Sequence, residues 1–282
     1  MHLGVLFNTD KLDRDQFLEY ARRVDELGFE SLWLPELFTR DPFAASAYIL
    51  ANTQQIMLAT GIANIYGRDP TATVSAASTL AEMSDGRFIC GLGVSNRSLA
   101  NARGHDWQNP VQFLADYLAA MAEVKLTSHQ ADFKTYVAAH GPKMLALAAD
   151  HADGVNTYLM PVEHAGQARQ AIDNKDLNTM LFCLADDNPD TARTTARRAI
   201  AYYMGLDYYH RAWRSLGYGD QDFADGGSDR LIDALVAWGS MDDIRARIAA
   251  QEAAGASRVV VIPIGAGLNG QPDWRLLQAI AE

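Results

Sequence analysis

The sequence predicts an α/β protein, and within that class a (β/α)8 TIM barrel with extra helices between strands 7 and 8. Short apolar runs alternate with segments of helical periodicity along the whole chain. These runs are continuously apolar rather than alternating, which is typical of parallel strands that are buried on both faces. The 282 residues also fit the usual size of one such barrel. A doubly wound open sheet is the alternative architecture.

Eight apolar runs are the expected strands, and helical patterns separate the first six of them. Residues 13–28 show the helical pattern well, because Phe17, Ala21 and Val24 recur at helical spacing and Gly28 follows as a C-cap. Further helices are expected over 43–53, 71–86 and 111–124, and another begins near Pro142. The expected strands cover residues 2–7, 31–35, 56–64, 87–94, 134–139, 153–160, 178–185 and 258–264.

The segment between the last two expected strands is longer than a bare barrel needs. We expect helices over 191–206, 207–219, 228–239 and 242–255, and a mobile Gly- and Asp-rich loop over 217–228. Several aromatic residues of this insertion are candidates for lining a substrate pocket, although such a stripe also suits a core. No linker or low-complexity segment interrupts the chain, so residues 1–282 are expected to form a single domain.

Composition excludes several classes of function. A formal net charge of −11 and a pI near 5.0 argue against binding to nucleic acid or to an anionic membrane surface. No apolar window is long enough to span a membrane, and the first ten residues lack the features of a signal peptide, so a cytoplasmic protein is expected. Cys90 and Cys183 lie in apolar runs and are expected to be buried thiols. The histidines are scattered without metal-ligand spacing, so no metal site is expected.

Polar residues follow the second and third expected strands, where the active sites of barrels collect. Glu36 comes directly after the second strand, next to apolar Trp33 and Pro35. Asn64, Tyr66 and Arg68 follow the third strand, and an amide, a phenol and a guanidinium beside one another suit recognition of a planar, hydrogen-bonding ring. The same residues also fit an ordinary loop that ends at the next helix.

Two glycine-containing motifs raise the question of anion binding. Gly141-Pro142 follows the fifth strand, and a helix that begins there would present N–H groups with partial positive charge. Residues 265–270, GAGLNG, match a dinucleotide fingerprint literally, but too few residues follow for the βαβ unit that it requires. A turn after the last strand explains that motif, and it leaves a minor anion role open.

Four stretches in order along the chain resemble the bacterial-luciferase-like family of flavin- and coenzyme F420-dependent oxidoreductases. They are residues 20–36, 58–95, 136–155 and 238–263. The most specific is 58–95, which ends in D-G-R-F-x-x-G-L-G. The resemblance covers most of the chain, and it implies a TIM barrel, usually a homodimer, with FMN or coenzyme F420 across the C-terminal ends of the strands.

The resemblance also assigns site residues. It implies a non-prolyl cis peptide at Gly61–Ile62 behind the cofactor ring, and a phosphate-binding loop after the fifth strand. Glu36 and Asn96 are the candidate catalytic residues. The candidate cofactor-binding residues are Gly61, Ile62, Asn64, Tyr66, Gly93, Ser95, Ala138, Ala139, His140, Gly141 and Pro142.

The expected reaction is hydride transfer to or from a small organic substrate through F420 or FMN. Several F420 enzymes of the family carry a histidine where this chain has Leu37, a glutamate where it has Asn96, and basic residues where it has 157–163. FMN therefore stays open beside F420, which is narrowly favoured. The alternatives are an FMN-dependent monooxygenase that uses reduced flavin and oxygen, and a non-catalytic flavin-binding protein. A cofactor-free hydrolase is disfavoured because the strand ends offer no carboxylate pair.

Overall fold

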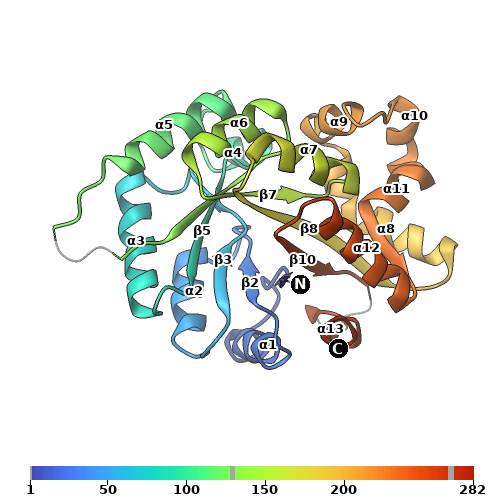
Figure 1. The fold of residues 1–282 in the computed structure, drawn as a ribbon, viewed down its shortest axis with the longest axis horizontal. Helices are drawn as coiled ribbons and strands as arrows, with labels where there is room; N and C mark the ends of the chain where they lie inside the picture. The colour runs from blue at the N-terminus through green and yellow to red at the C-terminus, as the bar shows by residue number, and fades with distance from the viewer. Residues whose placement is uncertain (1, 128–130, 266–269) are drawn as a thin grey trace.

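A closed barrel of eight parallel strands forms the centre of the molecule (Figure 1). The structure is a computed structural model that describes residues 2–127, 131–265 and 270–282. Strand β10 pairs with both β8 and β1, which closes the ring and confirms the predicted fold class. The barrel strands are β1 (Leu3–Leu6), β2 (Ser31–Leu34), β3 (Met57–Thr60), β5 (Phe88–Gly93), β6 (Lys134–Ala138), β7 (Gly154–Tyr158), β8 (Asp176–Ala185) and β10 (Arg258–Pro263).

Helices wrap the outside of this barrel, and the sequence explains where several of them begin. Asp41, Asp69 and Asn109 each accept hydrogen bonds from the first-turn N–H groups of a helix whose first residue is proline. The sequence analysis did not identify the helices α4 and α7. The helices up to β8 are α1 (Arg14–Glu26), α2 (Pro42–Leu50), α3 (Pro70–Met83), α4 (Arg97–Ala102), α5 (Pro110–Ala122), α6 (Pro142–His151) and α7 (Val162–Ile172).

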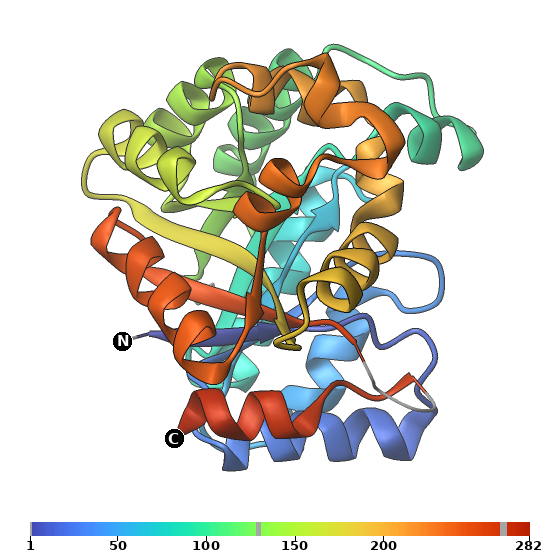
Figure 2. The same ribbon diagram turned by 90° about the vertical axis from the view of Figure 1, so that its right-hand side faces the viewer.

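The last helix, α13 (Trp274–Ala281), packs beside the first one (Figures 1 and 2). The Trp274 and Tyr20 rings have centroids 5.7 Å apart, and the Arg23 guanidinium lies 4.2 Å from the Trp274 ring centroid. The two ends of the chain are therefore held together on the outside of the barrel. The sequence analysis did not identify this helix either.

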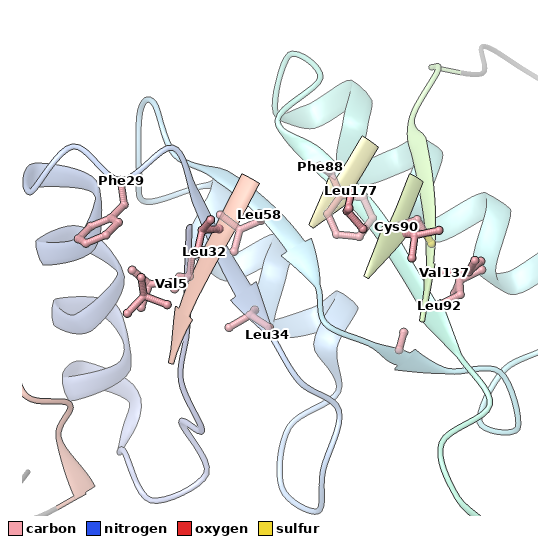
Figure 3. Packing of buried hydrophobic residues seen from close by; sticks show 14 of the residues in the cluster. Val5, Phe29, Leu32, Leu34, Leu58, Phe88, Cys90, Leu92, Val137 and Leu177 are labelled. Carbon is pink, nitrogen blue, oxygen red and sulfur yellow. The ribbon is translucent and has the colours of Figure 1, made fainter. Parts of the chain in front are cut away.

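Two hydrophobic clusters follow from the alternation of side chains along each strand. The first lies between the barrel and its helices, and Figure 3 shows part of it, including Val5, Leu32, Leu58 and Val137. The second fills the barrel interior with side chains such as Leu6, Trp33 and Met180 and continues into the insertion. Cys90 and Cys183 are free thiols buried in the first cluster, as expected, and burial raises the pKa of Cys90 to about 12.

The insertion differs from its prediction in two places. Residues 228–239 were expected to be one helix, but the helix ends at Leu235 and residues 236–239 extend as β9 beside the end of β8. Pairing with the exposed edge of β8 overrides the helical pattern. The insertion contains α8 (Pro189–Met204), α9 (Asp207–Arg214), α10 (Asp220–Phe223), a 3-10 turn (Ala224–Gly226), α11 (Asp229–Leu235), β9 (Val236–Gly239) and α12 (Met241–Ala253).

The second difference concerns residues 217–228, which were expected to be a mobile loop. They form α10 and the 3-10 turn, organised around the buried side chain of Asp222. Its carboxylate accepts hydrogen bonds from the Gly219 N–H at 2.9 Å and the Ser228 hydroxyl at 2.7 Å, and it pairs with Arg230. These bonds hold the pKa of Asp222 below its usual value.

The N-terminal end of the barrel is closed by a polar network. Arg258, which is 8% exposed, donates to Asn178 at 2.8 Å and to Glu30 at 3.0 Å. Beside it, Lys134 and Tyr136 donate to Asp176 at 2.7 and 2.6 Å. Burial alone would raise the pKa of Asp176, but these two donors and nearby Arg258 hold it below its usual value. The charges at this end are therefore compensated.

Candidate active site

The C-terminal ends of the strands form a mouth whose floor lacks side chains at two positions. The Gly61–Ile62 peptide is cis, as the resemblance implied. A Cβ atom added to Gly61 would lie 3.2 Å from both Leu6 and Trp33. A Cβ atom added to Gly93 would lie 2.7 Å from Cγ1 of Ile62. Glycine at these two positions therefore leaves room for the Leu6, Trp33 and Ile62 side chains, which pack directly against the backbone of the floor.

The cis peptide continues into a short strand, β4 (Ala63–Asn64), which pairs with the end of β5 opposite Leu92 and Gly93. Just below, Thr60 inserts its hydroxyl between β3 and β5, accepting from the Gly91 N–H at 2.8 Å and donating to the Gly91 carbonyl at 2.6 Å. A Cβ atom on Gly91 would collide with the Thr60 carbonyl oxygen at 1.9 Å. The glycine at position 91 thus supports the floor from beneath.

Glu36 lies beside this floor and makes contacts with both of its carboxylate oxygens. Oε2 accepts from the backbone N–H of Asn64 at 2.8 Å, and Oε1 pairs with Arg103 of the α4 region at 2.7 Å. Its side chain is 11% exposed. The Glu36 N–H also donates to the Ile62 carbonyl at 3.2 Å. The carboxylate therefore joins three segments of the mouth.

The two polar residues after β3 point in different directions. Asn64 is 2% exposed; its Oδ1 accepts from the Tyr66 N–H at 3.0 Å, while its Nδ2 has no hydrogen-bond partner among the described residues. Tyr66 packs against Trp107 and Phe113, and its hydroxyl accepts from the Gln108 N–H at 2.9 Å. Asn64 thus has a free donor, whereas Tyr66 supports the rim.

The residues after β5 form the next part of the rim. Ser95 adopts a left-handed conformation with φ 61°, and Asn96 is the N-cap of α4, accepting from the Leu99 N–H at 3.0 Å. The Asn96 Nδ2 donates to the hydroxyl of Tyr202 at 3.1 Å. This bond connects the β5 end to helix α8 of the insertion.

The expected phosphate loop follows β6 and leads into α6, which begins at Pro142 as predicted. The Ala139 N–H donates to the Asn156 carbonyl, so Ala138 and Ala139 are held against β7. The N-cap Gly141 has no side-chain cap, and a Cβ atom there would meet nothing within 4 Å. Within the described ranges, the N–H groups of His140 and Gly141 donate to no acceptor. Such a helix start suits an anion.

The imidazole of His140 does not face outward as a cation. Its Nε2 accepts from the Tyr158 N–H at 3.2 Å, which places the ring proton on Nδ1. Burial and the neighbouring His164 lower the pKa of His140 to about 3. The ring packs beside Tyr208 and Tyr209. His140 is therefore neutral near pH 7, and an anion would meet its backbone.

Aromatic residues of the insertion form one wall of the mouth. Tyr203 and Tyr158 share a hydrogen bond of 2.8 Å between their hydroxyls, and Tyr208 lies nearby. Burial raises the pKa of all three phenols. Tyr209 and Trp213 are buried instead, and the Trp213 indole donates to the Leu159 carbonyl at 3.1 Å. The aromatic stripe is thus divided between wall and core.

The structure brings most of the predicted site residues to one end of the barrel. The central part of GAGLNG, residues 266–269, lies outside the described residues. Within the described parts of the chain, no group of three or more His, Cys, Asp or Glu side chains could hold a metal ion.

Sequence reasoning missed four contributors, which are Arg103, Tyr158, His164 and Asn156. Asn156 lies inside the barrel on β7, and its Nδ2 has no partner among the described residues. The available signal for Asn156 was its polar side chain inside a run that was predicted to be buried. Arg103 and His164 lie on elements that were not predicted, so no signal pointed to them.

The model of the luciferase-like monooxygenase family matches residues 1–258. The chain belongs to this family. This match confirms the resemblance drawn from the sequence, and it covers every predicted site residue described above.

Individual relatives agree with this assignment. The 5,10-methylenetetrahydromethanopterin reductase of Methanolobus tindarius is 27% identical over 295 residues, covering 87% of this chain and 90% of the relative. The coenzyme F420-dependent tetrahydromethanopterin reductase of Methanopyrus kandleri has a similar structure, with a TM-score of 0.78, 19% identity, and coverage of 100% and 97%. A similar structure is also found in the FMN-bound oxygenating constituent of 3,6-diketocamphane monooxygenase from Pseudomonas putida. Its TM-score is 0.70 at 15% identity, with coverage of 100% of this chain and 97% of that chain.

Proposed function

We propose that this chain is a luciferase-like oxidoreductase that binds coenzyme F420 or FMN across the mouth of the barrel and acts on a small organic substrate. The carrying observation is the unpartnered, buried donor of Asn64 beside the floor at Gly61 and Gly93, where a larger residue would displace the side chains packed against the backbone. A flat ring with carbonyl acceptors fits this combination. The cofactor, when bound, supplies the hydride-transfer chemistry.

The residues of the chain supply binding, orientation and shielding. Gly61, Ile62 and Gly93 would support one face of the ring, and Asn64 would donate to its edge. Ser95 lies on the adjoining rim. The loop from Ala138 to Pro142 would hold the phosphate, and Tyr66 would act indirectly, by supporting the rim.

Glu36 and Asn96 are the proposed catalytic residues, and their contacts suggest how each would act. Glu36 is engaged by Arg103 and by the Asn64 N–H, so its carboxylate would be held in place as an acceptor near the ring. Asn96 has an amide that already caps α4 and reaches Tyr202, so it would orient a substrate rather than transfer a proton.

F420 is narrowly favoured over FMN because two similar structures, a reductase and a secondary alcohol dehydrogenase, and one oxidoreductase among the relatives carry F420 in their names. The acidic tail of F420 needs a cationic groove. Arg68 pairs with Asp41 at 3.1 Å, whereas Arg97 is exposed in the first turn of α4 and makes no ion pair within the described residues. Arg97 is therefore the proposed contact for that tail.

Equilibrium titration of the purified protein with each cofactor, followed by fluorescence, tests the proposal. We expect the wild-type chain to bind at least one of them. Asn64→Asp keeps the acceptor for the Tyr66 N–H and removes the free donor, so it should weaken binding about tenfold, the effect of one lost hydrogen bond to a buried group. Asn174→Asp, at an exposed position outside the mouth, is the matched control. Binding of neither cofactor by a folded wild-type chain contradicts the proposal.

An FMN-dependent monooxygenase is the alternative reaction, and the similarity to the FMN-bound monooxygenase structure favours it as the second candidate. Oxygen consumption with reduced FMN and a substrate distinguishes the two reactions. Tight binding with no change in the cofactor spectrum under any reductant or substrate would instead indicate a non-catalytic flavin-binding protein.

We also propose that residues 1–282 act as a single domain and assemble as a cytoplasmic homodimer through α2 and α3. These helices carry small exposed residues such as Ala44 and Ala47, and Met83 at the end of α3 is 79% exposed. No described helix is long and apolar enough to cross a membrane. Light scattering that gives a monomer at micromolar concentration would contradict the dimer.

A further inference from the structure

A second histidine lies behind the loop that leads into α6. His164, on α7, is 2% exposed, and its Nε2 lies 2.8 Å from the carbonyl oxygen of His140. A carbonyl oxygen only accepts, so Nε2 carries the proton and donates. Burial lowers the pKa of His164, which keeps the ring neutral. The side chain is therefore a fixed donor to one peptide of the loop.

That peptide joins His140 to Gly141, and its geometry transmits the orientation. In a planar trans peptide, the C=O and N–H bonds point in opposite directions. With the His140 carbonyl directed toward His164, the Gly141 N–H is directed away from it. This N–H has no acceptor among the described residues, and the position of a Cβ atom on Gly141 is open space.

The His140 side chain restrains the same part of the loop through contacts of its own. Its Nε2 accepts from the Tyr158 N–H, and its ring centroid lies 5.3 Å from that of Tyr209. The loop is therefore held by two neutral imidazoles. That of His140 contacts β7, and that of His164 lies on α7. The bound anion would meet the backbone donors of this loop, and Lys143 lies in the first turn of α6.

We propose that His164 is a positioning residue for phosphate recognition, which it accomplishes by donating to the His140 carbonyl and so directing the Gly141 N–H toward the cofactor phosphate. The proposal rests on the proposed function, because it takes this loop as the phosphate site. Polarisation of the peptide by the same hydrogen bond strengthens the Gly141 N–H as a donor.

Comparing FMN with riboflavin, which lacks the phosphate, isolates this role. His164→Leu should weaken FMN binding about tenfold, the loss expected for one misdirected hydrogen bond to a charged group, and leave riboflavin binding unchanged. His164→Gln, whose amide reaches a similar position, should restore most of the FMN affinity. His210→Leu is the matched control, because His210 makes the same kind of 2.8 Å bond to the Met204 carbonyl, away from the loop.

Gly141→Pro removes the N–H itself and supplies an independent test. If His164 acts through this N–H, the double variant should bind FMN no more weakly than Gly141→Pro alone. Should His164→Leu fail to fold, His164→Asn, whose amide is too short to reach the carbonyl, takes its place with the same expectation.

Equal losses for FMN and riboflavin, wild-type FMN affinity in His164→Leu, or additive losses in the double variant would each overturn the proposal. A wild-type chain that binds F420 but not FMN is tested in the same way with F420 and its phosphate-free deazaflavin. A folded wild-type chain that binds neither cofactor overturns the proposed function before any variant is made, and this inference with it.

Discussion

The two ends of the barrel are built from the same strands but treat their polar groups in opposite ways. At the N-terminal end, Arg258, Asn178 and Glu30 satisfy one another, and Asp176 is engaged by two donors. At the C-terminal end, the Asn64 Nδ2 and the Gly141 N–H have no partner among the described residues. A buried donor without a partner is costly, so the Asn64 Nδ2 favours a ligand at this end, whereas the paired charges at the other end stabilise the fold.

Glycine shows the same contrast. Gly4, near the N-terminal end, leaves room for the Ser31 hydroxyl and the Trp33 indole, which bond to each other at 2.9 Å. Gly93 leaves room for Ile62 of the floor. Gly4 makes room for a contact in the core, and Gly93 makes room for Ile62 and so keeps the floor flat. The surroundings of each glycine, rather than its residue type, show whether it supports the fold or belongs to the candidate site.

The largest expected effect on stability is at the closed end. Arg258→Ala leaves Asn178 and the partly buried Glu30 without their shared donor, so we expect the free energy of unfolding to fall by about 3 kcal/mol. Chemical denaturation measures this loss, and cofactor affinity of the folded protein should not change. Arg14→Ala, which removes an exposed ion pair with Asp15, is the control and should have no measurable effect. Similar losses in the two variants would remove the distinction between the ends.

The next effect is a dependence of stability on pH that arises at the mouth. The pKa of His140 is about 3 in the folded chain and near 6.5 when unfolded, so below pH 6.5 the unfolded chain binds a proton that the folded chain does not. Stability should fall as pH drops through this window, by about 2 kcal/mol between pH 7 and pH 5 from His140 alone.

Denaturation curves at these two pH values measure that slope in His140→Gln, which keeps an acceptor for the Tyr158 N–H. We expect the slope to be smaller in this variant than in the wild type. His151→Gln, at the exposed end of α6, should keep the wild-type slope. An unchanged slope in His140→Gln would mean that the imidazole accepts a proton without disturbing the loop.

The smallest expected effect concerns the link between the rim and the insertion. Tyr202→Phe removes the hydrogen bond to Asn96, and since Tyr202 is 58% exposed, stability should change by less than about 0.5 kcal/mol. Cofactor dissociation should become faster, because α8 is then held less firmly over the mouth. Stopped-flow displacement measures this rate. A slower or unchanged rate would show that the bond does not restrain the insertion.

The barrel could be predicted from the sequence because its strands are continuous apolar runs. The short strand β9 could not, because its four residues also continue the helical pattern of α11, and only the edge of β8 decides between the two. Asp222 shows the same limit. A Gly- and Asp-rich segment suggests a loop until the partners of the carboxylate are known.

The candidate site could be predicted only in part. Gly141 stood out because a helix was expected to begin beside it, and Gly61 and Gly93 were assigned by the family resemblance. The partners of Glu36 and of His140 could not be deduced, because Arg103 follows α4 and His164 lies on α7, far from them in sequence, and neither helix was predicted. Residue type thus indicated where the site is, and tertiary contacts decided which groups are free to bind.

Cofactor binding by Gly93→Ala tests the central claim most directly, that the open end of the barrel is a cofactor floor kept flat by glycine. The added Cβ would lie 2.7 Å from Cγ1 of Ile62, so the floor must shift. Isothermal titration of the wild-type and variant proteins with F420 and with FMN should show binding to the wild type and at least about tenfold weaker binding to the variant, with the folded spectrum retained. Equal affinity in the two proteins would contradict the account.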